Sequence, residues 1–319
     1  MRPYHWESHH GNFGDDLNLW LWDFLLPGLR DVHPDLLLVG VGTVLNDVLF
    51  PPAQRKLVIG SGYGYGAVPD ISNKELWDIR CVRGEMTAAK LGLPSEMGIV
   101  DPAVMVTEMS EFQGLPKIHK KTFVPHWESA EFGIWDFACE PAGLTYLDPR
   151  GEAKAVIKHI AQSEFIVAES MHGAILADAF RVPWVAVSTS TSINSFKWSD
   201  WAGSVGVKYE PRYVPVSTRA EAAKKGSKFW GMSFPPPPPP VNSAEHASSG
   251  HHHDGDVLVR PVQEQRSLRK LAKQVLAAPS TLALWQASRA EPRLSPDGRL
   301  EERKERFQAV LETIKRDYF

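Results

Sequence analysis

The chain has 319 residues, of which 43% are hydrophobic and 23% are charged, so it is long enough for one large or two medium domains. Its net charge of −3 gives no overall attraction to nucleic acid, and its two cysteines are too few for a disulfide framework. The first residues lack the apolar segment of a secretory signal, and no apolar run reaches the length of a membrane span, which predicts a soluble cytoplasmic protein.

Residues 1–115 are predicted to form a first Rossmann-like domain. Apolar runs at 35–45, 55–66 and 97–106 are typical of strands buried in a parallel sheet. The stretch 76–93 predicts a strand, a turn and a helix. This alternation predicts a doubly wound sheet.

Residues 116–233 show a clearer alternation and are predicted to form a second Rossmann-like domain. The predicted strands are His119–Trp127, Leu144–Pro149, Glu164–Ser170 and Val182–Ser188, and the predicted helices are Arg150–Gln162 and Met171–Arg181. We therefore expect an α/β fold whose two domains face each other across a cleft. In such folds the ligand lies beyond the carboxyl ends of the strands.

The remaining residues change in character. Residues 234–256 contain a proline run and small polar residues, which predicts a low-complexity linker. Residues 257–319 have helical periodicity and carry 13 lysines and arginines against 8 acids, a balance of +5. This tail either contacts an anionic membrane surface or presents a solvated face on helices docked to the second domain.

Two loops stand at places where ligands bind in such folds. The stretch GNFGDDL (Gly11–Leu17) puts a small turn and two acids before an amphipathic run, and Asp15 or Asp16 is suited to cap a helix that begins near Leu17. In the second loop, the strand that ends at Glu169 is followed by a helix for which Ser170 is a good N-cap.

His172 would then lie in the first turn of that helix, where backbone N–H groups favour an anion. The helix end lowers the pKa of His172, whereas Glu169 or a bound anion would raise it. A histidine balanced in this way is suited to proton transfer, and the alternative is a histidine that only caps or packs.

GNFGDDL, VRGE (residues 82–85) and ESMHGAILADA (residues 169–179), in this order, resemble the polysaccharide pyruvyl transferase family, and in particular its succinoglycan-type exopolysaccharide ketalases. The resemblance covers about residues 1–230 and implies a fold similar to two-domain GT-B glycosyltransferases. It also implies transfer of pyruvate from phosphoenolpyruvate to a hexose, with formation of a cyclic ketal and release of phosphate. Supporting stretches are Val39–Asp47, Asp101–Val106, Val124–Trp127 and Phe196–Trp201.

The resemblance implies roles for the residues of these loops. His172 would be the acid or the acid/base shuttle, and Arg83 would bind the carboxylate or phosphate of the donor with its planar fork. The alternative for Arg83 is a salt bridge to Glu85 or another acid. Ser170 and Gly173 would provide the anion-binding helix start.

On the acceptor side, Asp15 would hydrogen-bond sugar hydroxyls or remove a proton. The other residues expected to bind the acceptor are Asn12, Gly14 and Glu169.

The sequence departs from the wider family at one point. Many relatives carry an arginine one or two positions before the motif histidine, where this chain has Met171 and Ser170. Another cation must then hold the donor. His126 and Lys197 lie in motif-like loops and are preferred over the lysines at 120 and 121.

The expected partners are phosphoenolpyruvate and a lipid-linked oligosaccharide acceptor, with a peripheral contact at the inner membrane. The residues require neither a metal nor a resident cofactor. Two rival functions stay open. A nucleotide-sugar glycosyltransferase of GT-B type would need a ribose-binding acid, which is not evident after Ala174. A non-catalytic scaffold that retains the cleft would explain Met171.

Overall fold

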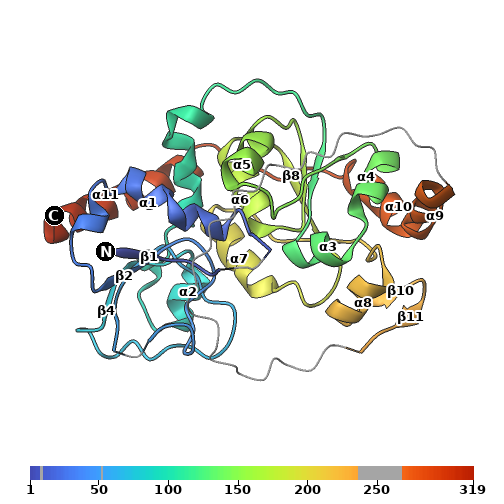
Figure 1. The fold of residues 1–319 in the computed structure, drawn as a ribbon. Helices are drawn as coiled ribbons and strands as arrows, with labels where there is room; N and C mark the ends of the chain where they lie inside the picture. The colour runs from blue at the N-terminus through green and yellow to red at the C-terminus, as the bar shows by residue number, and fades with distance from the viewer. Residues whose placement is uncertain (8–9, 52, 236–267) are drawn as a thin grey trace.

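The computed structural model describes residues 1–7, 10–51, 53–235 and 268–319, and its architecture is mixed α/β with two parallel sheets (Figure 1). The strands of the first sheet, in spatial order, are β1 (Arg2–Tyr4), β2 (Leu36–Val39), β3 (Arg55–Ile59) and β4 (Trp77–Cys81). Those of the second are β6 (Thr145–Tyr146), β5 (Thr122–Val124), β7 (Ile166–Ala168), β8 (Trp184–Ser188) and β9 (Arg212–Tyr213). An antiparallel hairpin consists of β10 (Lys228–Phe229) and β11 (Met232–Ser233).

The helices fall into three groups along the chain, and η marks a 3₁₀ helix. The first half has η1 (Asp15–Leu19), α1 (Leu21–Leu25), η2 (Leu29–Asp31), α2 (Glu85–Lys90), η3 (Ser95–Met97), η4 (Pro102–Glu108) and η5 (Ser110–Phe112). The second half has α3 (Trp127–Phe132), α4 (Trp135–Ala142), α5 (Ala153–Ala161), α6 (Met171–Ala179), α7 (Ser195–Ser204) and α8 (Arg219–Lys225). The tail has α9 (Leu268–Leu276), α10 (Ala278–Ala287) and α11 (Arg299–Tyr318).

The second half follows the predicted alternation of strands and helices. Its strands pair in parallel, and each predicted strand and helix is present over a shorter span. Polar caps fix the helix starts: the Glu152 carboxylate accepts hydrogen bonds from the backbone N–H groups of Lys154 and Ala155 at the start of α5. Local signals of this kind made this half predictable.

The first half departs from the predicted βαβ alternation. Glycine- and proline-rich loops connect β2 to β3 and β3 to β4, and the described residues of these loops contain no helix. The strand predicted at 97–106 is wrong. Asp101 accepts a hydrogen bond from the Ala103 N–H and Pro102 occupies the first turn, so the chain enters η4 instead.

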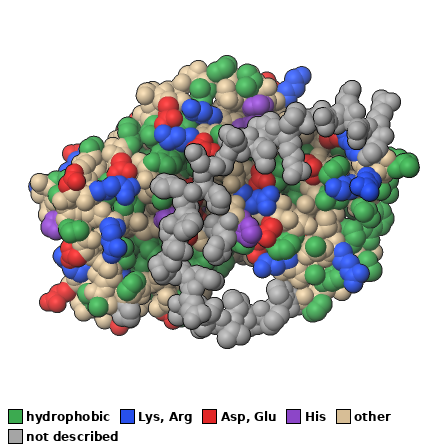
Figure 2. All heavy atoms as spheres, viewed as in Figure 1, with side chains coloured by type: hydrophobic (Ala, Val, Ile, Leu, Met, Phe, Trp, Pro, Cys, Tyr) green, Lys and Arg blue, Asp and Glu red, His purple; other side chains and the backbone are tan. Residues whose placement is uncertain are grey.

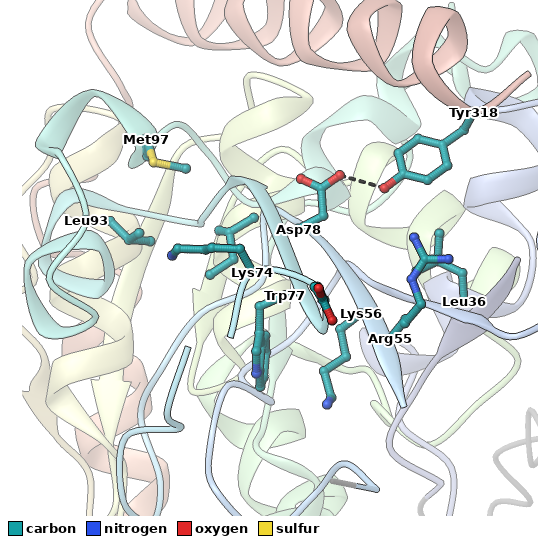
Figure 3. Close-up of a pocket in the computed structure, with 11 residues that line it drawn as sticks. Leu36, Arg55, Lys56, Lys74, Trp77, Asp78, Leu93, Met97 and Tyr318 are labelled. Atoms are coloured by element: carbon teal, nitrogen blue, oxygen red, sulfur yellow. Dashed lines mark hydrogen bonds between the residues drawn. The ribbon is translucent and has the colours of Figure 1, made fainter. Parts of the chain in front are cut away.

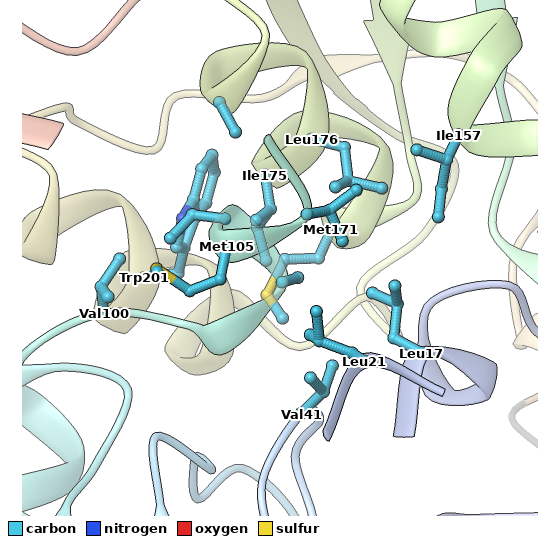
Figure 4. Close-up of a cluster of buried hydrophobic side chains, with 14 of the residues drawn as sticks. Leu17, Leu21, Val41, Val100, Met105, Ile157, Met171, Ile175, Leu176 and Trp201 are labelled. Atoms are coloured by element: carbon cyan, nitrogen blue, oxygen red, sulfur yellow. The ribbon is translucent and has the colours of Figure 1, made fainter. Parts of the chain in front are cut away.

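The two halves share a hydrophobic core. Leu17 and Leu21, from the segment that follows the N-terminal loop, contribute to the same buried cluster as Met171, Ile175 and Leu176 of α6 (Figure 4). All nine residues of α6 are buried, as its apolar sequence requires. The N-terminal loop and the start of α6 are therefore held close together by apolar packing.

The helices of the tail dock on both halves of the molecule. The predicted docking to the second domain is therefore found for some of these helices and not for all. Helices α9 and α10 lie beside α4 in the second half, but α11 runs along the first half (Figure 1). Phe307 and Leu311 of α11 are buried in the shared core, and Arg80 of β4 forms an ion pair with Asp317. The linker predicted at 234–256 lies outside the described residues from 236 onward.

Candidate active site

The start of α6 has the predicted geometry. Ser170 is the N-cap, and its Oγ accepts a hydrogen bond from the backbone N–H of Gly173 at 3.3 Å. Gly173 lies close to the sheet, because a Cβ there would be 3.1 Å from Cγ1 of Val124. His172 therefore lies in the first helical turn, beyond the carboxyl end of β7.

The N-terminal loop packs directly on the His172 ring. A Cβ on Gly14 would lie 2.0 Å from His172 Nδ1, so this contact requires glycine. The Phe13 ring meets the imidazole edge-to-face, with centroids 6.4 Å apart. The Phe13 N–H also donates to the Pro149 carbonyl at 3.0 Å, which ties the loop to the second half. Residues from both halves thus converge at His172.

Asp15 follows this contact and lies at the start of η1. Neither Asp15 nor Asp16 caps that helix with its side chain, because the N-cap is Gly14. Asn12 instead donates from its Nδ2 to an Asp15 carboxylate oxygen at 2.6 Å and accepts from the Gly14 N–H at 3.3 Å. Asn12, Gly14 and Asp15 therefore form one hydrogen-bonded turn beside the histidine.

A buried carboxylate that the sequence analysis did not assign faces His172. Asp101 Oδ2 lies 3.8 Å from His172 Nε2. Both atoms are buried, and neither has a hydrogen-bond partner among the described residues. In the sequence, Asp101 belonged to a predicted strand and began a stretch that supports the family resemblance, but neither gave it a role.

The pKa values of the two predicted acid/base groups are shifted in opposite directions. Burial, with the charges of Lys197 and Arg83, lowers the pKa of His172 to about 3. Burial raises the pKa of Asp15 to about 7, although Lys197 opposes the shift. Near neutral pH the imidazole is therefore uncharged, whereas the carboxyl of Asp15 is partly protonated.

Lys197 of α7 is a cation close to the predicted acid/base residues. Its charge lowers the pKa values of Asp15, His126 and His172, so it lies near all three. Its ammonium lies 5.4 Å from the centroid of the Tyr65 ring. Within the described part of the chain this ammonium forms no ion pair or hydrogen bond, which leaves its charge available to an anionic ligand.

Arg83 forms a salt bridge to an acid, although the partner is Asp200 of α7 and not Glu85. The guanidinium is fully buried and donates to Asp200 at 3.1 Å, to Thr43 at 2.7 Å and to the Tyr63 carbonyl at 3.2 Å. Each of its three nitrogens therefore has a protein partner. Arg83 joins the first half to α7 through Asp200, and its positive charge contributes to the lowered pKa of His172.

Glu169, expected on the acceptor side, lies in a buried polar network. Its carboxylate accepts hydrogen bonds from the His126 N–H at 2.9 Å and from Lys225 Nζ at 3.1 Å, and also from the hydroxyls of Ser129 and Thr189. The structure does not bring it to the turn that contains Asp15. His126 is the N-cap residue of α3, and its buried Nδ1 lies 3.9 Å from Glu128 Oε2 without a hydrogen-bond partner among the described residues.

A cavity of about 490 Å³ lies elsewhere in the first half (Figure 3). It is lined by residues near β3 and β4 and by Tyr318, whose hydroxyl donates to Asp78 at 2.6 Å. None of the predicted site residues lines it. In the described segments, no group of three His, Cys, Asp or Glu side chains is placed to hold a metal ion, and no helix is long and apolar enough to cross a membrane.

Comparisons with known proteins agree with the motifs in these loops. The sequence model of the polysaccharide pyruvyl transferase family matches residues 12–191, a range that contains Asp15, Asp101 and His172. The succinoglycan biosynthesis protein ExoV of Rhizobium meliloti (strain 1021) is 65% identical over 320 residues, which cover the whole of both chains. No solved structure matches this chain.

Proposed function

Since the chain belongs to the polysaccharide pyruvyl transferase family, we propose that it transfers pyruvate from phosphoenolpyruvate to a hexose of a bacterial exopolysaccharide precursor. The product would be a cyclic ketal, and phosphate would be released. The observation that carries this proposal is the convergence of His172, Asp15 and Lys197 at the start of α6.

Lys197 and the start of α6 are suited to the anionic donor. Phosphoenolpyruvate carries a carboxylate and a phosphate, and each needs positive charge or N–H donors. Lys197 supplies an ammonium without a protein partner in the described chain, and α6 supplies its N-terminal N–H groups beside Ser170 and Gly173. Lys197 thus takes the place of the arginine that relatives carry near Met171.

The shifted pKa values support a division of the acid/base work. Protonated Asp15 gives its proton to the methylene carbon of the enol, which leaves an oxocarbenium-like carbon. Neutral His172 takes the proton of the first sugar hydroxyl as that oxygen attacks. This assignment reverses the roles expected from the sequence, because the free site holds its proton on the carboxyl and not on the imidazole.

The protons of the two sugar hydroxyls pass to the phosphate and to Asp15. His172 passes its proton to the phosphate as the bond between carbon and the phosphate oxygen breaks. The second sugar hydroxyl then closes the ring and returns a proton to Asp15. One hydroxyl proton thus replaces the one that went to the new methyl group, and the other leaves on phosphate.

We further propose that the two parallel sheets belong to two Rossmann-like units in a GT-B-like arrangement. Support comes from the position of the site, which follows β7 of the second sheet and is covered by the loop after β1 of the first. In open parallel sheets ligands bind beyond such carboxyl ends.

The outer face of α9 supports the proposal of a peripheral contact with the cytoplasmic face of the inner membrane, where a lipid-linked acceptor would lie. Lys270 and Gln274 point to Glu140 of α4, while Leu271 and Val275 are 59% and 57% exposed. Figure 2 shows hydrophobic side chains along the edge where α9 and α10 lie. Amphipathic helices with such faces bind membrane interfaces.

The direct test of the proposed function supplies phosphoenolpyruvate together with a β-galactoside or a β-glucoside. We expect phosphate release that depends on the acceptor, and a gain of one pyruvate less water in the mass of the sugar. Phosphoenolpyruvate without acceptor is the control. Turnover with a nucleotide sugar in place of phosphoenolpyruvate would identify a glycosyltransferase, and binding of the donor without turnover would overturn the proposed acid/base mechanism.

A further inference from the structure

We propose that Asp101 is a positioning residue that holds the His172 imidazole in the tautomer protonated on Nε2. The proposal rests on the proposed role of His172 as the base, but its geometry can be tested without turnover. It concerns a carboxylate that neither the motifs nor the comparisons assign.

The two atoms concerned are the unsatisfied ends of two buried side chains. Asp101 Oδ2 and His172 Nε2 lie 3.8 Å apart, and both lack partners among the described residues. A buried polar atom without a partner is costly, and two such atoms that face each other satisfy one another when they approach by about 0.8 Å, to normal hydrogen-bond distance. Hydrogen bonds in catalytic sites are often long before the ligand binds.

Asp101 is held firmly enough to act in this way. Its other oxygen, Oδ1, accepts a hydrogen bond from the Ala103 N–H at 3.0 Å and thereby caps η4. The capping bond fixes the carboxylate, so Oδ2 keeps its direction toward the imidazole. Asp101 Oδ1 thus caps η4, while Oδ2 is available to His172.

The opposite nitrogen of the ring, Nδ1, packs on the N-terminal loop. Nδ1 lies against Gly14, in the turn that continues into Asp15. A proton on Nε2 that points to Asp101 leaves Nδ1 without a proton, as the proposed role of the imidazole as a base requires. The ionised carboxylate of Asp101 then stabilises the imidazolium that forms.

The charges around the ring make such a partner necessary. Lys197 from α7 and Arg83 from the loop after β4 both disfavour a positive charge on His172. The carboxyl of Asp15, from the N-terminal loop, is protonated in the competent state and supplies no charge. Among these groups Asp101, at the start of η4, is the anion that faces Nε2.

The variant Asp101→Asn separates this role from the cap. Asparagine caps helices as well as aspartate does, so its Oδ1 keeps the bond to Ala103. Its amide nitrogen then replaces Oδ2 and presents a donor to Nε2. The expected result is a switch of His172 to the tautomer protonated on Nδ1, with kcat lowered about 100-fold and KM for phosphoenolpyruvate within about twofold of wild type.

Asp178→Asn is the matched control. Asp178 lies on α6, the helix that carries His172. Like Asp101, it is buried, and it has one hydrogen-bonded carboxylate oxygen and one without a hydrogen-bond partner among the described residues. This variant makes the same chemical change away from His172. We expect it to leave the His172 tautomer and kcat as they are in the wild type.

The tautomer is read by ¹⁵N NMR of the imidazole, with the His172 signal assigned by its loss in His172→Ala. In the wild type we expect the proton on Nε2, and a proton on Nδ1 would overturn the proposal even if Asp101→Asn failed to fold. An unchanged tautomer in Asp101→Asn would also overturn it. If the wild type transfers no pyruvate, the proposed function fails while the NMR result still decides the role of Asp101.

Discussion

The charged groups around His172 and those around Lys225 both contain buried side chains, but their polar atoms are satisfied to different degrees. The first group, the site cluster, consists of Asp15, Asp101, His172 and Lys197, and it contains two facing atoms and one ammonium without partners in the described chain. The second group, the Lys225 cluster, consists of Lys225, Glu169, Glu221, Ser129 and Thr189, and there Lys225 Nζ alone has four hydrogen-bond partners.

The pKa of Glu169 in the Lys225 cluster is shifted in the opposite direction from those of Asp15 and Asp101 in the site cluster. Although burial opposes it, the charges of Lys225 and His126 and two side-chain hydrogen bonds lower the pKa of Glu169 to about 2. The Glu169 carboxylate therefore keeps its charge at every working pH. In the site cluster, burial instead raises the pKa of Asp15 to about 7 and that of Asp101 to about 6. Burial also raises the pKa of Glu221, in the Lys225 cluster, to about 7, so the two clusters are distinguished by the unbonded atoms at His172 and Asp101 and not by a pKa near neutrality alone.

The largest effect on activity is expected from the removal of His172 in the site cluster. His172→Ala should lower kcat between roughly 100- and 10,000-fold, because the base for the sugar hydroxyl is removed. The unfolding midpoint should also fall, because the buried ring packs against Phe13 and Gly14 and its removal leaves a cavity, so activity is measured below that midpoint. Phosphate release and thermal unfolding measure the two effects.

His159→Ala is the control, because His159 also has a pKa lowered by burial, to about 4, but lies on α5 away from the site. It should retain wild-type kcat. Equal activity of His172→Ala and His159→Ala would remove His172 from the mechanism.

The next effect is on stability and belongs to the Lys225 cluster. Lys225→Met leaves Glu169 buried without its cation, and breaking a buried pair in this way costs about 3–5 kcal/mol. Urea unfolding should show that loss. The double variant Lys225→Met with Glu169→Gln removes both charges and should recover part of it. A loss below about 1 kcal/mol in the single variant would contradict the structural role of this cluster.

The two clusters also show what could be predicted from the sequence. Ser170 and His172 were placed correctly at the start of α6 because the cap and the strand before it are local signals. For Glu169, only one residue earlier, the bond to Lys225 could not be predicted, because the two residues are 56 positions apart. The same limit applies to Arg83, whose acid partner Asp200 is 117 residues away.

Asp101 was missed for a related reason. The apolar run at 97–106 predicted a strand, and only the tertiary structure shows that Asp101 caps η4 and faces His172. In the first half the glycine-rich loops contain no periodic pattern, so the replacement of crossover helices by loops could not be predicted. Residues that act through contacts between distant segments leave little trace in local sequence.

A smaller effect is expected for the cation of the site cluster. Lys197→Met should raise KM for phosphoenolpyruvate about 10- to 100-fold, the worth of a hydrogen bond to a charged group. Lys90→Met is the matched control, because Lys90 also lies over a tyrosine ring of the same glycine-rich loop. Lys90→Met should bind the donor as the wild type does. An unchanged KM in Lys197→Met would leave the donor without its proposed cation.

The smallest effect is a shift in the pH profile of kcat/KM, which tests whether Asp15 donates the proton to the enol. Because the pKa of Asp15 is raised to about 7, the protonated fraction of the free enzyme, and with it kcat/KM for phosphoenolpyruvate, should fall about tenfold per pH unit above that value. Lys197 lowers the pKa of Asp15, so Lys197→Met should move this descending limb to higher pH. The ionisation of the substrate is the same for both proteins, so the displacement between their profiles reports the enzyme alone. A limb at the same pH in both would mean that another group supplies the proton to the enol.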